Sequence, residues 1–315
     1  MSKSLSTHDS THVIDTPALS ASSEKKSSMF KDFLDVCKTG IVYSNLFTTF
    51  AGMWLALKLT DQLFFDNIIN MVLVLAGSAL VIAGGCCLNN YIDRDMDQLM
   101  ERTKHRPSAV GRLHPNQVLW GGIILSALGA ILLFMGSMVS AVIGLVALFV
   151  YVVVYTMWLK RTHSINTIVG GIAGAAPPMM GWAAIDPSLS NMVPWLLFAF
   201  MFLWQPPHFL ALALKRVDEY RRAGVPMLPV IAGKEMTKRQ MNFYVILLLP
   251  ASLLLYELGI VYVIAAIVMG GAWLAISISG FFTKDMAKWS RNMFLFSLNY
   301  MIILFVVMII SVLFK

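Results

Sequence analysis

Long apolar stretches, each followed by a short polar segment, repeat along most of the chain. Nine of them reach the length of about 20 residues that a helix needs to cross a lipid bilayer. These stretches span residues 40–60, 68–90, 117–136, 138–157, 166–185, 192–212, 241–257, 258–281 and 292–314. The seventh and eighth nearly fuse around Glu257, so their boundary is the least sharply defined. Because backbone polar groups in lipid must be satisfied within each segment, the pattern predicts an all-α, polytopic membrane protein with nine transmembrane helices.

The composition supports this prediction and excludes several other classes. Hydrophobic residues make up 58% of the 315 residues and charged residues only 13%, about half the charged share of ordinary soluble domains. A soluble globule of this length could not bury so much apolar surface in one core. The composition also excludes a disordered chain, a collagen and a coiled coil. The three cysteines (Cys37, Cys86 and Cys87) form neither a metal motif nor a disulfide framework.

The first 35 residues differ from the rest because they are rich in Ser and Thr and contain no apolar run. We expect residues 1–35 to form a disordered cytoplasmic tail. A signal peptide is not expected, because no apolar core follows a basic start. Asp9, Asp15 and Glu24 argue against a mitochondrial presequence, which is poor in acids.

Lys and Arg are distributed unequally between the two sides of the predicted bundle. With the tail in the cytoplasm, 22 of the 24 lie on the cytoplasmic side, and only Lys58 and Lys315 lie opposite. This bias predicts a cytoplasmic N-terminus and a periplasmic C-terminus. It also accounts for the net charge of +7 without nucleic acid, and with no presequence a bacterial inner membrane is the expected location.

The polar end of the second stretch carries the first candidate site. Asn89, Asp93 and Asp97 are spaced four residues apart, so they share one helix face. Carboxylates near hydrocarbon are costly and usually functional, and oxygen ligands of this kind suit Mg²⁺ bound together with a substrate diphosphate. Cations follow at Arg102, Lys104 and Arg106. The alternative is a cluster in which acids and bases pair and anchor the helix end.

The segments 89–97 and 100–107 resemble the first signature of the UbiA-type intramembrane prenyltransferases, whose pattern is Asn-x-x-x-Asp-x-x-x-Asp. Within that superfamily they are most similar to the protohaem IX farnesyltransferase branch. The resemblance implies a UbiA-like helical bundle and a single intramembrane prenyltransferase domain over residues 36–315. It further implies that Asn89, Asp93 and Asp97 hold Mg²⁺ while nearby cations bind the diphosphate.

A second polar segment follows the sixth stretch and strengthens the resemblance. Pro206 and Pro207 precede His208, which stands where other branches carry an acid. The resemblance leaves three roles open for His208: contact with the haem iron, contact with a propionate, or proton transfer. The alternative is a histidine that only packs at a helix end. Arg216, Asp218, Glu219 and Tyr220 complete this motif, and the sequence leaves open which of the two acids is functional.

Two further features concern the arrangement of the chain. Lys160 and Arg161 follow the fourth stretch and either bind the diphosphate or mark the cytoplasmic side. Small residues are dense in 170–181, which favours close helix packing. The offset of 119 residues between Asn89 and His208 suggests a pseudo-repeat of two four-helix halves that present one loop each to a shared site.

The resemblance implies transfer of a farnesyl group from farnesyl diphosphate to a vinyl group of haem B, with water addition, giving haem O. The expected partners are these two substrates, the lipid bilayer, and a haem A synthase or a terminal oxidase assembly partner. One alternative is a related prenyltransferase with an aromatic or chlorin acceptor. A secondary transporter is a second alternative, but it predicts ionisable residues deep within the spans, whereas the acids here lie at helix ends.

Overall fold

The computed structural model describes residues 28–314, and all of its regular elements are helices. The first half contains α1 (Met29–Cys37), α2 (Thr39–Leu59), α3 (Phe64–Ile92), α4 (Arg94–Asp97), α5 (Pro115–Gly136), α6 (Met138–Phe149), the π-helix η1 (Val150–Leu159) and α7 (Lys160–Thr162). The second half contains α8 (Asn166–Trp182), α9 (Val193–Lys215), α10 (Val217–Arg222), α11 (Leu228–Ile231), α12 (Gly233–Leu253), the 3₁₀ turn η2 (Tyr256–Leu258), α13 (Ile260–Ser279) and α14 (Met286–Ser311).

Each of the nine predicted stretches overlaps one long helix, except the fourth, which α6 and η1 share; the predicted all-α membrane bundle is confirmed. Within residues 28–314, seven helices are long and apolar enough to cross a membrane by themselves. The other two are α8, which has 17 residues, and α12, which begins with a polar segment. Both pack lengthwise against α9, so their length and composition do not have to match those of an isolated span.

Two predicted boundaries differ from the structure. The seventh stretch was expected over 241–257, but α12 begins eight residues earlier at Gly233 and ends at Leu253. A 3₁₀ turn and Gly259, at a φ of 104°, then separate it from α13. The predicted tail extends to residue 35, yet Met29–Cys37 form α1. The rest of that tail, residues 1–27, lies outside the described residues.

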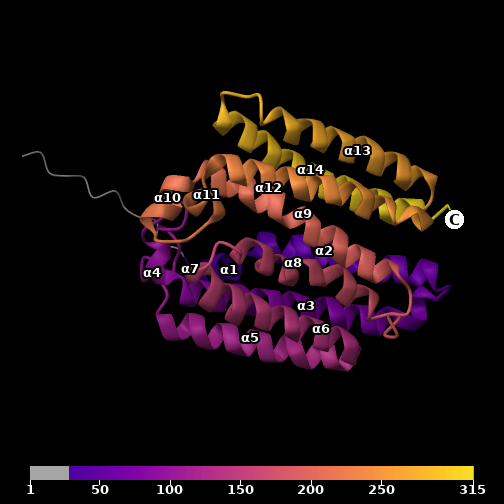
Figure 1. Cartoon of the computed structure of the whole chain (residues 1–315). Coiled ribbons are helices and arrows are strands. Elements are labelled where there is room, and N and C mark those ends of the chain that lie inside the picture. The colour runs from indigo at the N-terminus through magenta and orange to yellow at the C-terminus, as the bar shows by residue number, and fades with distance from the viewer. Residues whose placement is uncertain (1–27, 315) are drawn as a thin grey trace, which may run out of the picture.

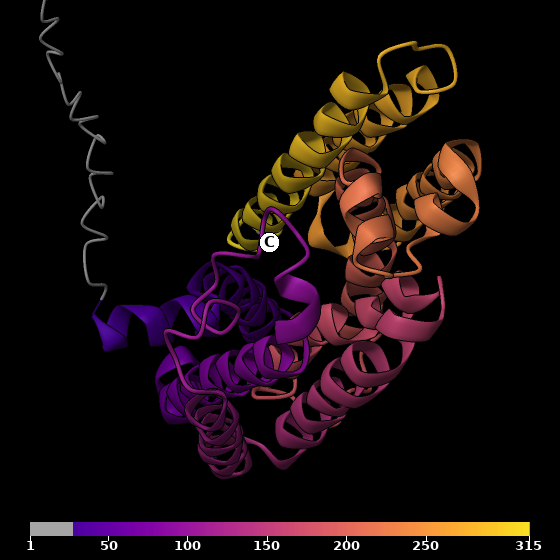
Figure 2. The same cartoon turned by 90° about the vertical axis from the view of Figure 1, so that its left-hand side faces the viewer.

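The long helices form a ring in which the last span returns to the first. α2 contacts α3, α8 and α14, and α9 contacts α8, α12 and α14. Figure 1 shows α5 and α6 on one side of the bundle and α13 and α14 on the other, with α9 between them. Figure 2 shows α14 beside the N-terminal helices when the bundle is viewed along its length. The Trp54 indole of α2 also donates to the backbone oxygen of Ile309 on α14 at 3.2 Å.

The small residues of α8 allow the backbones of α2 and α8 to touch. A Cβ atom on Gly181 would lie 1.9 Å from the backbone oxygen of Thr49, and one on Gly52 equally close to that of Pro178. No side chain fits in either place, which is the physical reason for glycine at these positions. The predicted packing role of the 170–181 segment is confirmed at Gly181.

Candidate active site

The first motif lies at the end of α3, where the helix continues almost without a break into α4. The Asp93 amide donates to the Asn89 backbone oxygen at 2.9 Å, and the Asp97 amide donates to the Asp93 oxygen at 2.8 Å. This continuity keeps the three motif side chains on one face. All three are buried, at 3% exposure or less. The geometry expected from their spacing is therefore present.

Cations from three other elements converge on this face. Lys38, between α1 and α2, donates to Asn89 Oδ1 at 2.6 Å. Lys160, at the end of η1, donates to Asp93 Oδ2. Arg106, in the loop after α4, donates to Asp97 Oδ2 at 2.8 Å. Each motif side chain thus has a different cation as its partner.

The charge balance of this cluster favours an anionic ligand. Three cations face two carboxylates, so the net charge is positive in a largely buried place. Burial strengthens electrostatic interactions because little water is present to screen them. It also lowers the pKa of Lys38 to about 8, although the nearby Asp93 carboxylate opposes that shift. A diphosphate would compensate the excess positive charge.

The residues present also fit a divalent cation that is bound together with such an anion. No group of three or more His, Cys, Asp or Glu side chains in residues 28–314 could hold a metal alone. Mg²⁺, however, commonly uses only one or two carboxylates together with substrate phosphates. Asp93 Oδ1 is buried without any hydrogen-bond partner in the described structure. A buried carboxylate oxygen without a partner is costly, and a cation would satisfy it.

The π-helix η1 leads directly into Lys160, the first residue of α7, and supplies a second partner of Asn89. Thr156 Oγ1 accepts a hydrogen bond from Asn89 Nδ2 at 3.1 Å and donates to the Tyr151 backbone oxygen at 2.8 Å. Asn89 Nδ2 also donates to Asp93 Oδ2 at 2.8 Å, so the Asn89 amide is oriented with its oxygen toward Lys38. π-helical turns are rare in proteins, and those that occur often lie at functional sites.

The structure separates the predicted diphosphate-binding cations into two groups. Arg106 and Lys160 contact the motif. Arg161 instead makes two hydrogen bonds to the more exposed Asp95, at 2.7 and 2.8 Å. Lys104 pairs with Glu101 on the surface at 2.6 Å, and Arg102 is exposed. The structure therefore does not bring Lys104 and Arg161 onto the motif face, and Arg102 forms no ion pair with a motif carboxylate within residues 28–314.

Lys38 is the residue that sequence reasoning missed. No role was assigned to it from the sequence. In the structure Lys38 adopts a left-handed backbone conformation, with a φ of 53°, between α1 and α2. Non-glycine residues rarely adopt this conformation, and such strain is frequent at functional sites. A lysine directly before an apolar span was the available signal.

The second motif divides between two faces of α10. Glu219 points inward and accepts from Arg216 at 2.8 Å, while its second oxygen, Oε2, is buried without a hydrogen-bond partner. Asp218 points outward, with 86% of its side chain exposed, and pairs with Arg221. Of the two acids that the sequence left open, only Glu219 thus faces the protein interior.

Tyr220 connects the two motifs. Its side chain packs with Met96, which lies within the first motif, with Met100 just after it, and with Val225 and Met227 from its own loop. Burial raises the pKa of the Tyr220 hydroxyl. The loops after α3 and after α9 therefore meet at one end of the bundle, as the predicted shared site requires.

His208 lies away from the oxygen cluster, in the contact between α9 and α14. Its ring stacks on Trp204 and on Phe294, with centroids 4.5 and 4.8 Å apart. Nδ1 lies 2.6 Å from the Ser297 hydroxyl oxygen, and that hydroxyl donates to the Phe294 backbone oxygen at 2.6 Å. Ring stacking and this contact both orient His208.

The helical ring and the buried Asn-Asp-Asp face at its end define an intramembrane prenyltransferase of the UbiA class. The UbiA prenyltransferase family model matches residues 45–299, so the chain belongs to this family. Family membership confirms the predicted enzyme class and argues against the secondary transporter.

Curated relatives identify the branch. The chain is 56% identical over 310 residues to the protoheme IX farnesyltransferase of Alkalihalophilus pseudofirmus, covering 98% of this chain and 99% of the relative. It is 52% identical over 286 residues to the enzyme of that name from Geobacillus kaustophilus, covering 91% and 92%. The predicted resemblance to the protohaem IX farnesyltransferase branch is thus confirmed.

Solved structures share the fold. A structure described as digeranylgeranylglyceryl phosphate synthase superposes with a TM-score of 0.71 at 19% identity, covering 91% of this chain and 99% of the other. A UbiA homologue from Archaeoglobus fulgidus, bound to DMAPP and Mg²⁺, superposes with a TM-score of 0.61 at 14% identity, covering 85% and 98%. At these identities the likeness concerns the fold alone.

Proposed function

We propose that this chain transfers the farnesyl group of farnesyl diphosphate to a vinyl group of haem B, with addition of water, and so produces haem O and diphosphate. The observation that carries the proposal is the buried Asn89–Asp93–Asp97 face with three converging cations, in a chain that matches protoheme IX farnesyltransferases along nearly its whole length.

The reaction begins with heterolysis of the allylic C–O bond, and the residues of the first motif assist the departure of the diphosphate. Asp93, Asp97 and Asn89 would hold Mg²⁺, which stabilises negative charge on the leaving oxygens. Lys38, Lys160 and Arg106 turn from their motif partners toward the phosphate oxygens and bind them. Because these cations already lie at hydrogen-bond distance from the motif, little rearrangement is required.

The vinyl group of haem B then attacks C1 of the allylic cation, and water captures the resulting cation with loss of a proton. The bundle shields the first cation from premature hydrolysis. Tyr220 packs on Met96 of the first motif, and the neighbouring Glu219 orients Arg216. We propose that the inward-facing Glu219 is the functional acid of the second motif.

We further propose that the end of the bundle that carries the site faces the cytoplasm of a bacterial cell, with the protein in the inner membrane. The sequence-based assignment of 22 of the 24 Lys and Arg residues to the cytoplasmic side supports this orientation. The C-terminus would then face the periplasm. A haem A synthase or terminal oxidase assembly partner would receive the product.

The test uses membranes that contain the chain, supplied with haem B, farnesyl diphosphate and Mg²⁺. Haem O is expected as the product, identified by its mass and absorbance, and membranes without the chain should give none. Prenylation of an aromatic or chlorin acceptor in place of haem B would overturn the proposal. Chelation of Mg²⁺ should stop product formation, and its addition should restore it.

A further inference from the structure

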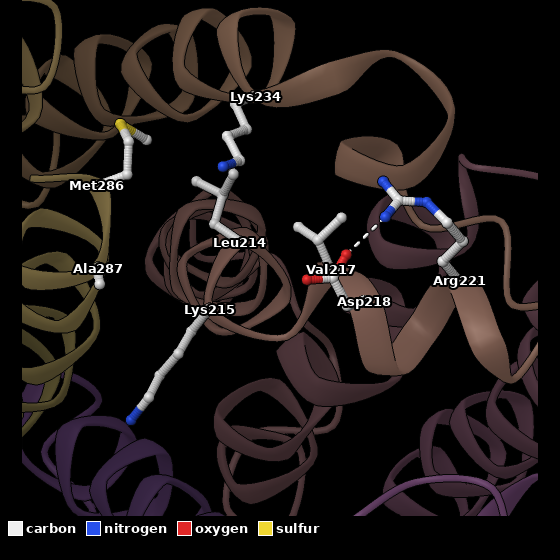
Figure 3. A pocket seen from close by; sticks show the side chains of 8 residues that line it. All are labelled: Leu214, Lys215, Val217, Asp218, Arg221, Lys234, Met286 and Ala287. Carbon is white, nitrogen blue, oxygen red and sulfur yellow. Dashed lines mark hydrogen bonds and ion pairs between the residues drawn. The ribbon is translucent and has the colours of Figure 1, made fainter. Parts of the chain in front are cut away.

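A pocket of about 390 Å³ opens at the site end of the bundle, between α9, α10, α12 and α14. Its lining comprises Leu214, Lys215, Val217, Asp218, Arg221, Lys234, Met286 and Ala287. Figure 3 shows Lys234 reaching toward Leu214 from the start of α12, while the Arg221–Asp218 ion pair borders the other side. None of these residues contacts the oxygen cluster of the first motif.

The pocket is suited to an anion attached to an apolar body. Three cations and one carboxylate line it, and within the described chain no carboxylate pairs with Lys215 or Lys234. The other half of the lining is apolar. A ligand that presents negative groups to Lys215 and Lys234 and apolar surface to Leu214 and Met286 would satisfy both halves.

The corner between α9 and α10 lies between this pocket and the first site and contributes residues to both. Neighbouring residues point to opposite sides of the corner, because Lys215 lines the pocket whereas Arg216 turns to Glu219. Likewise Asp218 lines the pocket and Tyr220 packs on Met96 beside the first motif. The pocket and the cluster that packs on the first motif therefore lie on opposite sides of the same corner.

Below the pocket, stacked aromatic rings fill the contact between α9 and α14. His208 lies six residues before Leu214 on α9, a helical distance of about 9 Å. Phe294 lies seven residues after Ala287 on α14 and stacks on His208. These rings pack against one another, so the body of a ligand bound in the pocket would lie above them.

We propose that Lys215 and Lys234 bind the propionate carboxylates of the haem acceptor. This inference rests on the proposed function and assigns the acceptor subsite. In haem B the two propionates lie on the edge of the ring opposite the vinyl groups. Holding the propionates in the pocket leaves the vinyl edge free to face the diphosphate site across the α9–α10 corner. A phospholipid headgroup carries negative charge too, so the experiment must distinguish haem propionates from such a headgroup.

The test compares haem B with its dimethyl ester, which lacks the two negative charges. Purified protein, without farnesyl diphosphate, is titrated with each compound and binding is followed by absorbance. The wild-type chain should bind haem B about tenfold more tightly than the ester, as expected for a partly exposed charge-assisted contact. The double variant Lys215→Gln/Lys234→Gln should lose this preference and bind both compounds like the ester. Equal binding of the two compounds by the wild-type chain would overturn the proposal.

Steady-state kinetics give a second readout. The double variant should raise KM for haem B about tenfold, while KM for farnesyl diphosphate stays within about twofold. Lys31→Gln, on the exposed surface of α1, removes one charge from the same end and should change neither constant. A rise in KM for farnesyl diphosphate instead would assign the pocket to the diphosphate and overturn the subsite.

Binding of a phospholipid headgroup in the pocket is tested by repeating the titration in phosphatidylcholine vesicles with and without phosphatidylglycerol. If the two lysines hold haem propionates, the variant's defect persists in both membranes. A defect seen only with the anionic lipid would assign the pocket to a headgroup and overturn the proposal. Failure of the wild-type chain to bind haem B or to form haem O would overturn the proposed function as well, whereas an unchanged KM for haem B in the double variant overturns only the subsite.

Discussion

The two polar helix ends at α3 and α9 look alike in the sequence but are built differently. The α3 end is a dense network in which Asn89, Asp93 and Asp97 each contact a cation from another element. At the α9 end, His208 is held by aromatic rings and Ser297, while Arg216 and Glu219 pair within one turn. The α3 end is therefore a preassembled anion site. At the α9 end, His208 serves helix packing, and Arg216 and Glu219 hold the turn into α10.

The largest expected effect tests the network at α3. Asp93→Asn removes one negative charge and leaves Lys160 without its partner, so we expect kcat to fall by about 10²–10³-fold. The variant should also lose its dependence on Mg²⁺ concentration. The measurement is the initial rate of haem O formation across a Mg²⁺ titration.

Asp95→Asn is the matched control for this prediction, because Asp95 lies two residues away on the other face and pairs with Arg161. An exposed ion pair contributes little, so the rate should change by less than about threefold. Equal losses in the two variants would contradict the distinction between the motif face and its surroundings.

The second effect compares adjacent cations. Lys160→Gln should lower kcat/KM for farnesyl diphosphate by about 30-fold, because it removes a charge-assisted contact at a buried site. Arg161→Gln should cost less than about fivefold, since Arg161 is engaged with Asp95 outside the motif. Steady-state kinetics at saturating haem B measure both. A larger loss at Arg161 would place the diphosphate on the other side of η1.

The third effect compares the two acids of α10. Glu219→Gln weakens the orientation of Arg216 and should reduce kcat by about tenfold. Asp218→Asn changes an exposed ion pair and should leave kcat within about twofold. The same haem O assay is used. The reverse order would show that the outward acid is the functional one.

A fourth, smaller effect concerns the contact between α9 and α14. Ser297→Ala removes the hydroxyl that orients His208 but leaves the ring stacking intact, so we expect a loss of stability of about 1 kcal/mol. Thermal unfolding in detergent measures it. Ser297→Thr retains a hydroxyl and should recover part of the loss, provided that its extra methyl group is accommodated.

The smallest effect is a pH dependence at Asp95. The hydrogen bonds from Arg161 lower the pKa of Asp95 from 3.8 to about 2. Because the pKa in the folded protein is lower than in the unfolded chain, ionised Asp95 stabilises the fold above pH 4 and loses this effect as the pH falls toward 2. The difference in melting temperature between wild type and Asp95→Asn should therefore shrink over that interval. A difference that grows as the pH falls would contradict the sign.

Sequence alone determined the helical bundle, the motif face and the family. Apolar length predicts spans because lipid cannot satisfy backbone polar groups, and the spacing of Asn89, Asp93 and Asp97 requires one face wherever the helix continues. Small residues in α8 likewise predicted close packing, which Gly181 and Thr49 show.

Only the tertiary structure decided which charges meet. Lys38, Thr156 and Lys160 are separated from Asn89 and Asp93 by 51 to 67 residues, and no local pattern reveals that they are neighbours. Lys104 and Arg161 look equivalent to Arg106 in the sequence, yet they pair with Glu101 and Asp95 instead. The reason is physical: helix periodicity sets the direction of a side chain on its own element, whereas partners across the bundle depend on how separate elements pack.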